Sequence, residues 1–486
     1  MDLGYNVEES LPGLLSCAVM IGEKEVELAA ERAMKVHLEF MLPDGAWDNS
    51  WGTRNNKWSY WGSRTSDGCQ PGYGLLAKKS PEFAEAVRRN TRLLKACTHD
   101  GLLHGGPMFN SAKEPPCVHH TFCHAKALAA LLDLGWAEET IETGTESLPS
   151  DRRCGVTEFP SVHVRLIGKG PWRATISDYD VEYSEEGHAT GGAVTLLWHE
   201  RLGPVFTGTM GRYSLVEPNN MQIPRNTVPL CLTPRLEYQE HGIIYRNIND
   251  KAAEVICVEE KDEIVIVTRG TMTDSGQQGD SRFEIRIRIT DGAFTMEPWC
   301  EREAILYLPL VSRSGERVEP AADGDGVDIC RGQGSRLKVR ASGPLTVSQD
   351  RLFNPVGGME AVLCQMKVDT EENEMKIITT DVAAGRYFDE TAAVWKEEPD
   401  RESGLVTIYP EKQYQSVLGF GGAFTQAAGY AWSALNSEQR SEAVNAYFSA
   451  AGLGYRFCRT HINSCDFSLR NYCYVADGDE ALSTFS

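Results

Sequence analysis

The sequence lacks the features that mark several large classes of protein. No apolar run approaches the roughly 20 residues that a helix needs to cross a membrane. Positive charge is scarce, because 48 Lys and Arg stand against 69 Asp and Glu, giving a formal net charge of −21. Such an acidic chain repels the phosphate backbone of nucleic acids. The stretch GFGGAF, residues 419–424, has no Gly-Lys-Ser/Thr ending and does not predict a phosphate-binding loop. We expect neither a membrane span nor a nucleic-acid partner.

Metal-binding and disulfide patterns are also missing. The fourteen cysteines are scattered without the spacing of a disulfide or zinc scaffold, which predicts mostly reduced thiols. His120 and His124 stand four residues apart on a predicted helix, a spacing that can hold zinc. No HExxH pattern or second cysteine pair accompanies them, so we expect packed, hydrogen-bonded histidines, no metal and no other cofactor.

The N-terminus does not look like a signal peptide. Acidic residues at positions 2, 8 and 9 occupy the place of the basic segment that a signal peptide begins with. This favours a cytoplasmic location. The stretch DLGYNVEES resembles the middle of a domain, however, and a start upstream of Met1 would leave a secreted or periplasmic location open.

Residues 1–150 alternate helical segments with loops rich in glycine and aromatic residues. Residues 23–41 repeat apolar side chains with a period close to 3.6. A second helix is expected over 81–97, with Ser80 as its N-cap. A third covers 119–135, and one of its faces is formed by Val118, Phe122, Ala125, Ala129 and Leu132. Helix pairs joined by such loops predict an α-helical (α/α) toroid-like domain, N-terminally incomplete because the helical part is short for a full toroid.

From about Phe159 the apolar pattern changes to a two-residue period. In RFEIRIRIT, residues 282–290, Phe and Ile occupy one face, and Arg282, Arg286 and Arg288 occupy the other. We interpret this basic face as solvated surface. Similar runs at 263–270, 304–311 and 375–382 predict a large antiparallel β-sandwich over 155–395. The charged, proline-containing stretch 396–404 is a predicted linker.

Residues 400–486 have the pattern of an α/β unit. Strands are expected at 406–409, 417–420 and 455–462. A helix is expected over 437–450, with Asn436 as its N-cap and Gln439 completing a capping box. Strand, helix and strand in this order predict the start of a parallel sheet or barrel.

The motifs GFGGAFTQAAGYAWSAL, SCDFSL and YCYVAD lie in this unit. With them, residues 404–486 closely resemble the opening of the glucosylceramidase-like family 30 glycoside hydrolases. The resemblance implies an incomplete (β/α)₈ barrel, in a family that cleaves β-glycosides with retention by means of two glutamates. The family carries these glutamates after its fourth and seventh strands, so we expect both to be absent here.

The same resemblance implies a sugar-binding Asp in the loop that follows SCDFS. Asp477 is the match, with Arg470 in the same loop, although the loop is one residue longer than the family pattern. The alternative is that the two side chains pair with each other or face solvent.

The loop of residues 44–68 is dense in tryptophan, with four in fifteen positions. Indole faces stack on sugar rings, and Arg and Asn side chains bind hydroxyls or a carboxylate. Arg54, Asn55 and Trp58 are therefore candidate substrate-binding residues. The alternative is that the aromatic side chains plug the interior of the helical domain.

A helical toroid followed by a large sandwich resembles the heparinase-type polysaccharide lyases, over about residues 1–395. The resemblance implies an elimination on a uronate polymer at the cleft between the two domains, with Tyr or His removing the C5 proton. Tyr60, His120 and His188 are the candidate catalytic residues, and His188 takes the place of the sandwich histidine.

Together these patterns predict a carbohydrate-active protein that acts on an oligo- or polysaccharide or a β-glycoside. The leading hypothesis joins a polysaccharide lyase-like toroid and sandwich to a truncated β-glycosidase segment. Two alternatives remain, a non-catalytic glycan-binding protein and a fragment of a longer retaining β-glycosidase.

Overall fold

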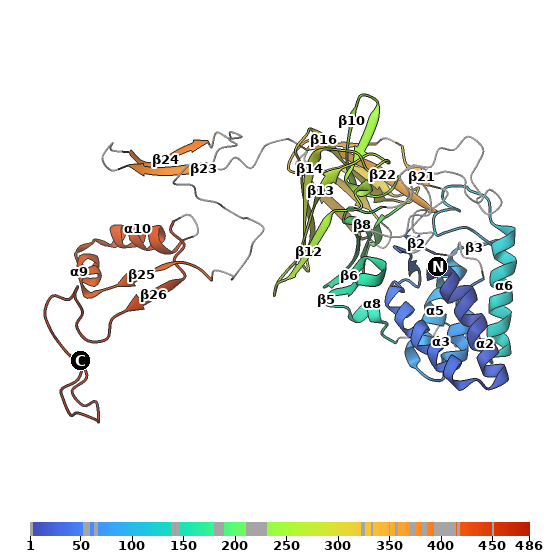
Figure 1. Cartoon of the computed structure of the whole chain (residues 1–486), viewed down its shortest axis with the longest axis horizontal. Coiled ribbons are helices and arrows are strands. Elements are labelled where there is room, and N and C mark those ends of the chain that lie inside the picture. The colour runs from blue at the N-terminus through green and yellow to red at the C-terminus, as the bar shows by residue number, and fades with distance from the viewer. Residues whose placement is uncertain are drawn as a thin grey trace. The chain divides into compact units, whose positions relative to one another are not determined.

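The computed structural model describes most of the 486-residue chain. The described residues are 3–51, 59–62, 67–137, 141, 146–178, 189–209, 231–321, 326–331, 334–348, 350–354, 358–368, 376–381, 386–392, 415, 418–449 and 452–486. They fall into two compact units, Met1–Ala392 and Ala393–Ser486, and each is described by itself (Figure 1). The predicted strand 406–409 and the predicted linker 396–404 lie outside the described residues.

The first unit begins with a helical region. Its helices are α1 (Leu3–Tyr5), η1 (Asn6–Ser10), α2 (Leu11–Ile21), α3 (Lys24–His37), η2 (Leu38–Phe40), α4 (Gln70–Leu76), α5 (Pro81–Ala96), α6 (Val118–Asp133) and α8 (Pro149–Arg152). Two short ladders lie between them, β1 (Trp47–Asp48) with β2 (Tyr60–Trp61), and β3 (Thr98–His99) with β4 (Leu102–Leu103). The three predicted helices correspond to α3, α5 and α6.

The helix signals in the sequence are confirmed, with one correction. Ser80 caps α5 by accepting a hydrogen bond from the backbone N–H of Glu82. The apolar face predicted for α6 exists, but Phe122 and Leu132 on it face solvent. The helix instead buries the opposite face, with His124 and Leu131, because that side lies against α4. Periodicity alone finds an apolar stripe without saying which side the fold covers.

Antiparallel sheets make up the rest of the first unit. A five-stranded meander contains β5 (Gly155–Phe159), β6 (Val164–Lys169), β7 (Trp172–Ser177), β8 (Ala193–His199) and β9 (Gly203–Thr207). A six-stranded sheet contains β10 (Arg235–Glu240), β11 (Ile243–Arg246), β16 (Ala304–Val311), β20 (Leu345–Val347), β21 (Leu352–Asn354) and β22 (Met359–Val368). A four-stranded sheet contains β12 (Glu254–Glu259), β13 (Ile264–Met272), β14 (Ser281–Ile289) and β15 (Phe294–Cys300). Smaller ladders are β17 (Arg317–Pro320), β18 (Gly326–Cys330) and β19 (Arg336–Arg340), and the hairpin of β23 (Lys376–Asp381) and β24 (Arg386–Ala392). The short helices η3 (Pro160–Val162) and η4 (Asn247–Asn249) lie in connections.

Strand β14 carries the alternation that the sequence predicts. Its Phe and Ile side chains are buried in a core that also receives side chains from the five-, six- and three-stranded sheets. The arginines on the other face form ion pairs with glutamates. Arg282 reaches Glu301 at 3.4 Å, Arg286 reaches Glu284 of the same strand at 3.5 Å, and Arg288 reaches Glu263 at 3.2 Å. This agrees with a solvated, charge-balanced face. The toroid and the sandwich themselves remain predictions.

Helices and sheets share part of one core. Leu93 and Leu94 of α5 lie in the same buried cluster as Leu196 of β8, Val311 of β16 and Ala361 of β22. The helical region is therefore packed directly on two of the sheets.

The second unit is an α/β segment. Strand β25 (Gly421–Phe424) pairs in parallel with β26 (Phe457–Thr460), and α9 (Gln426–Ala434) and α10 (Ser437–Phe448) connect them. The capping box of Asn436 and Gln439 at the start of α10 is confirmed. The strand expected at 417–420 begins later, at Gly421, since Gly419 has a φ of +148° that interrupts an extended run. The sequence pattern did not predict helix α9.

Two findings apply to the described part of the chain as a whole. All fourteen cysteines are free thiols, as the sequence predicts. Of the described helices, none is long and apolar enough to cross a membrane.

Candidate functional site

The loop that follows η2 is tied to the five-stranded sheet by the carboxylate of Asp44, a residue that is half-buried. Asp44 Oδ2 accepts hydrogen bonds from the hydroxyl of Tyr60 at 2.9 Å and from the indole N–H of Trp198 on β8 at 3.3 Å. Its Oδ1 accepts from the backbone N–H of Ala46 at 3.1 Å. Burial raises the pKa of Asp44 despite these three donors.

A second buried carboxylate lies four residues further on. Asp48 accepts hydrogen bonds from the backbone and hydroxyl of Ser50, and from the hydroxyl of Thr175 on β7 at 2.5 Å. Burial raises the pKa of Asp48 to about 6, and the nearby Arg153 opposes that rise. Arg153 is itself paired with Glu39 at 2.8 Å.

Hydroxyl groups join the end of the same loop to β8 and β9. Ser59 Oγ donates to the carbonyl of Thr195 at 2.5 Å, and it accepts from the backbone N–H of Gly208 at 2.7 Å. Thr195 Oγ1 donates to Ser50 Oγ at 2.8 Å. We call this set the junction layer. It consists of the half-buried Asp44 and the buried residues Asp48, Ser50, Ser59, Tyr60, Thr175 and Thr195.

Three segments begin or end at the junction layer. Segment 52–58 is flanked by Ser59 of the layer. Segment 179–188 follows the end of β7, where Ser177 is paired with Ala193 two residues beyond Thr175. Segment 210–230 follows Thr209, whose neighbour Gly208 bonds Ser59. The described residues that flank these three segments therefore lie at or next to the junction layer.

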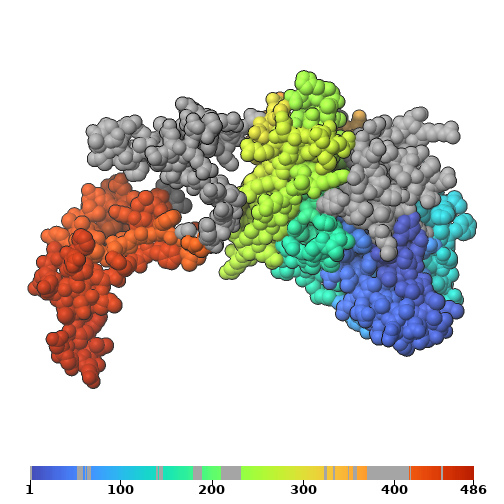
Figure 2. All heavy atoms as spheres, viewed as in Figure 1, coloured from blue at the N-terminus to red at the C-terminus, as the bar shows by residue number. Residues whose placement is uncertain are grey.

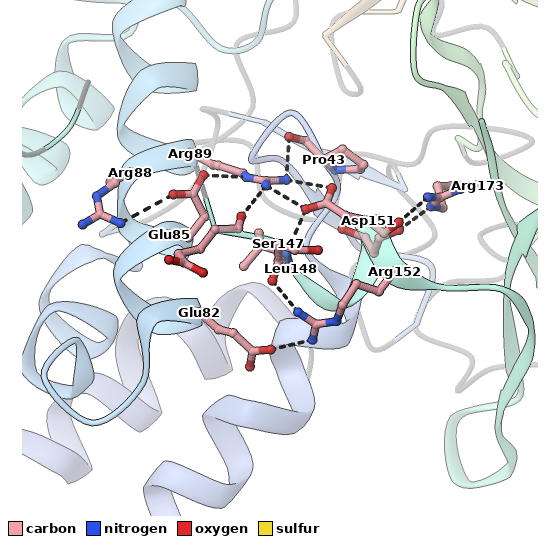
Figure 3. A network of polar contacts seen from close by, with 12 residues as sticks. Pro43, Glu82, Glu85, Arg88, Arg89, Ser147, Leu148, Asp151, Arg152 and Arg173 are labelled. Carbon is pink, nitrogen blue, oxygen red and sulfur yellow. Dashed lines mark hydrogen bonds and ion pairs between the residues drawn. The ribbon is translucent and has the colours of Figure 1, made fainter. Parts of the chain in front are cut away.

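An ion-pair network holds the residue before Asp44 in place. Arg89 of α5 bonds Glu85 at 2.9 Å, both carboxylate oxygens of Asp151 at 2.9 and 2.7 Å, and the carbonyl of Pro43 at 3.2 Å (Figure 3). Arg173 of β7 donates to the carbonyl of Asp151 at 2.8 Å. The network therefore connects α5, α8 and β7 beside the junction layer.

Of the residues predicted for this site, four fall outside the described residues. These are Arg54, Asn55, Trp58 and His188. Tyr60 is described and buried, and its hydroxyl proton is held by Asp44. Burial, followed by the charge of Asp44, raises the pKa of Tyr60 well above its ordinary value. The phenol is therefore held neutral.

His120 lies in the first turn of α6. Its backbone N–H bonds Cys117 Sγ at 3.5 Å, and its ring lies 5.3 Å from that of His119, measured between ring centres. His124, one turn further on, is buried against the loop at Gly68. No group of three or more His, Cys, Asp or Glu side chains within the described residues could hold a metal ion.

The aromatic side chains described in the tryptophan-rich loop are core residues. Trp47 is fully buried and stacks on Tyr73 with ring centres 5.8 Å apart. Trp51 lies edge-on to Phe40 at 5.7 Å. For these two residues the interior-plug alternative is the correct one, whereas Trp58 lies outside the described residues.

The second unit contains a pocket at the carboxyl ends of its parallel strands. The pocket has a volume of about 330 Å³ and lies where β25 and β26 end. Its lining includes Thr425, Arg459, His461 and Asp466, with Phe424 and Phe467 as apolar walls. His461 Nε2 is 2.9 Å from the hydroxyl of Tyr472. The carboxyl end of a parallel barrel is where such folds place their active sites.

The two residues predicted for this unit do not line the pocket. Arg470 and Asp477 are both exposed, and no ion pair joins them within the described residues. Asp466, inside the SCDFS motif itself, lines the pocket. The signal that could have found it is its place in the segment that follows the second strand, on the side where parallel strands end. The sugar-binding roles of Arg470 and Asp477 stay predictions.

Comparison with known families gives three matches along the chain. Residues 1–150 match the ulvan lyase N-terminal domain, and residues 156–381 match the ulvan lyase C-terminal domain. Residues 417–486 match the glycosyl hydrolase family 30 TIM-barrel domain. The chain thus joins ulvan lyase-like polysaccharide lyase domains to a partial glucosylceramidase-like segment, and both resemblances drawn from the sequence are confirmed.

Individual relatives agree with this division. The broad-specificity ulvan lyase of Formosa agariphila is 36% identical over 396 residues, covering 79% of this chain and 61% of that protein. The lysosomal acid glucosylceramidase of Mus musculus is 42% identical over 83 residues, covering 17% of this chain and 16% of that enzyme. The chain therefore spans less than two thirds of either relative. A crystal structure of heparinase III aligns with a TM-score of 0.36 and 12% identity, over 74% of this chain and 59% of that one. A likeness at that level does not establish a shared fold.

Proposed function

We propose that residues 1–381 act as a polysaccharide lyase of the ulvan lyase type, with the active site above the junction layer. In this proposal the helical region is the toroid-like domain and the antiparallel sheets form the sandwich, with domain limits near 150 and 395. The observation that carries it is the 36% identity to an ulvan lyase over 396 residues. The meeting of three chain segments at the junction layer supports the location.

The proposed reaction is an elimination on a uronate unit. A base removes the C5 proton, the electron pair forms a C4=C5 double bond, the C4–O bond breaks, and the leaving oxygen takes up a proton. Arg54 and Asn55 would bind the carboxylate and so favour loss of the C5 proton, and Trp58 would stack on a sugar ring.

Among the three catalytic candidates, Tyr60 is the least suited to act as the base. It is buried, and its proton is already donated to Asp44, so it is poorly suited to accept a proton. We propose His188, which lies between β7 and β8 in the sequence, as the base. His120, at the start of α6, is the alternative.

The full chain mixed with ulvan tests the proposal. We expect an unsaturated uronate product that absorbs in the near ultraviolet, and a loss of at least 100-fold in rate for His188→Ala. The matched control is His241→Ala, an exposed turn residue of the β10–β11 hairpin, which should keep full activity. Loss of activity in His120→Ala but not in His188→Ala would identify His120 of α6 as the base. Binding of ulvan without product, abolished by Trp58→Ala, would instead favour a non-catalytic glycan-binding protein.

A second candidate function belongs to the pocket of the second unit. We infer that it binds a neutral sugar through Arg459 and Asp466. Both side chains line the pocket, and neither forms an ion pair with another described residue, so both can bond hydroxyl groups. The resemblance of this segment to glucosylceramidases supports a β-glucoside as ligand.

Ligand-observed NMR with methyl β-glucoside and the full chain tests this second function. We expect saturation transfer to the sugar that Asp466→Ala weakens at least tenfold. Asp477→Ala, which changes an exposed carboxylate outside the pocket, is the matched control and should have no effect. Equal loss in both variants, or no transfer with the unmodified chain, would contradict the assignment.

A further inference from the structure

The three-stranded sheet of β17, β18 and β19 has one apolar face and one charged face. Val327, Ile329 and Leu337 lie on the apolar face and are buried in the core of the antiparallel sheets. Residues directly opposite each other on neighbouring strands share a face, so the register defines the charged face. Its charged residues are Arg317, Glu319, Asp328, Arg336, Lys338 and Arg340. Among the described residues, this face therefore carries four cations and two carboxylates.

This excess of positive charge distinguishes the face from the arginine-rich face of β14. The four-stranded sheet that contains β14 also reaches the surface of the first unit (yellow-green in Figure 2). There, Arg282, Arg286 and Arg288 each form an ion pair with a glutamate. On a chain with a net charge of −21, a local excess of cations is not a general property of the surface, and it favours an anionic ligand.

Lys338 forms no ion pair with another residue that the structure describes. It is exposed, and the register sets it opposite Asp328. That carboxylate is occupied by Arg336 at 3.0 Å and by Arg340 at 2.8 Å, which flank Lys338 on the same strand. Asp328 thus holds two guanidinium groups in place, while the ammonium group of Lys338 is available to an anion from outside.

The three cations of β19 form a line. Arg336, Lys338 and Arg340 alternate with two apolar residues, so they share one face. A strand rises about 3.3 Å per residue, which gives neighbouring cations a spacing of about 7 Å and the line a length of about 13 Å. Strand β19 stands at the end of its sheet, and no described strand pairs with its other edge. Such a line fits a linear polymer that carries negative charges at intervals.

We propose that the charged face of β17, β18 and β19 is a second binding site, which holds an anionic polysaccharide by its carboxylate or sulfate groups. None of its residues belongs to the junction layer, so the site is separate from the proposed catalytic site. The choice of ulvan as the polymer rests on the proposed function, whereas the site itself rests on the charges of this face. Two sites on one unit can engage the same polymer, which raises the affinity for long chains and not for short fragments.

Affinity electrophoresis of the full chain in native gels that contain dextran sulfate tests the binding. This sulfated glucan has no uronate, so the proposed elimination cannot cleave it. We expect it to retard the unmodified chain, and we expect Lys338→Glu to weaken this binding about fivefold. Arg282→Glu is the matched control, because it changes the net charge equally at an exposed residue of the charge-balanced face. Equal weakening in both variants, or none in either, would overturn the proposal.

Unfolding curves check that both variants keep the fold. Lys338→Gln removes one charge without adding another and should give a smaller loss of binding. It keeps the test valid if the charge reversal disturbs the strand.

Three further gels test the chemistry of the ligand. Neutral dextran should not retard the unmodified chain, and about 0.5 M NaCl should abolish retardation by dextran sulfate, because salt screens exposed charges. Retardation that persists in this salt would contradict a site built on charge. Equal retardation by double-stranded DNA would mean a general polyanion surface and would refute the assignment to a polysaccharide.

Kinetics on ulvan test the role of the site in the proposed reaction. We expect Lys338→Glu to raise the KM for long ulvan about fivefold with an unchanged kcat. Both constants should stay unchanged on short ulvan oligosaccharides, since these occupy the catalytic site alone. A structural effect of the substitution would instead lower kcat on both substrates. An unchanged KM for long ulvan would refute the role in substrate retention. Absence of any product from the unmodified chain would contradict the proposed function, and the gels would still decide the binding site.

Discussion

The two units of this chain differ in how their structure is maintained. The first unit contains four clusters of buried side chains. The second unit has two helices, two paired strands and complete helix caps, yet none of its described residues is buried. Local signals such as caps and apolar periods are thus sufficient to specify elements, whereas burial of apolar surface is what stabilises them against the loss of chain entropy.

The same contrast applies to the two candidate sites. The junction layer is built of carboxylates and hydroxyls whose partners are fixed by surrounding core. The pocket of the second unit is lined by exposed and half-buried side chains on two strand ends and the segments that follow them. A variant that removes core contacts should therefore mainly destabilise the first unit, whereas a variant that removes a local contact should mainly affect the second unit.

Removing the largest buried aromatic side chain should cause the largest loss of stability. Trp47→Ala deletes a fully buried indole that stacks on Tyr73, and we expect the first unit to lose about 4 kcal/mol of unfolding free energy. Urea unfolding followed by circular dichroism measures this loss. Trp432→Ala, at a partly exposed position on α9, is the matched control and should leave the same transition unchanged. If both variants shifted the urea transition equally, the two units would unfold together.

Breaking the ion-pair network of Figure 3 should lower the unfolding free energy of the first unit somewhat less than Trp47→Ala does. Arg89→Ala leaves the buried carboxylate of Glu85 with its weaker contacts to Arg88 and Arg92, and we expect a loss of about 3 kcal/mol. Arg302→Ala removes an exposed ion pair of the sheet region and is the matched control, because solvent screens such a pair and its loss should hardly change the unfolding free energy. A small loss for Arg89→Ala would mean that α5 and α8 are held mainly by apolar contacts.

Asp48 makes the junction layer sensitive to pH. Burial raises its folded-state pKa from 3.8 to about 6, so its protonated form fits the fold better than its charged form. Its contribution to stability therefore falls as the pH rises from about 4 to about 6, by roughly 3 kcal/mol at most. We expect the stability of Asp48→Asn, relative to the unmodified chain, to rise over this range.

Unfolding free energies at pH 4, 5, 6 and 7 measure that difference. Asp477→Asn, which changes an exposed acid of the second unit, serves as the control for general charge effects. The difference in unfolding free energy between Asp48→Asn and the unmodified chain could instead stay constant with pH. That result would mean that the Asp48 carboxylate is charged in the folded state at all four pH values, and that Arg153 stabilises its charge.

Much of the fold follows from the sequence, because its local signals are strong. Ser80 caps α5, Asn436 and Gln439 cap α10, and the alternation in β14 separates buried Phe and Ile from paired arginines. The exposed face of α6 was not predictable, since the side on which α4 packs is set by tertiary contacts. Helix α9 carries a short, weakly periodic pattern that gives little signal.

The candidate site was predictable only in part. The tryptophan-rich loop was found from composition, but the same composition suits a core, and Trp47 and Trp51 are core residues. Asp44 and Asp48 were not selected as site residues, because their burial depends on β7 and β8, more than a hundred residues away in the chain. In the second unit the motif was recognised, and Asp466 inside it lines the pocket. The sugar-binding role of Asp477 stays a prediction.

The smallest expected effect concerns a helix cap, and it distinguishes the two units most directly. Asn436→Ala removes the side chain that accepts from the backbone N–H of Gln439 at 2.9 Å, a loss of about 1 kcal/mol. Since α10 buries no described residue, we expect this loss to appear as about fivefold faster amide hydrogen exchange along α10. Ser80→Ala removes the corresponding cap of α5, whose buried face includes Phe83 and Val87. Exchange in the middle of α5 should stay slow, because packing holds that helix after its cap is lost. If α10 were equally insensitive, its apolar side chains would have to be covered in solution, and the contrast between the two units would fail.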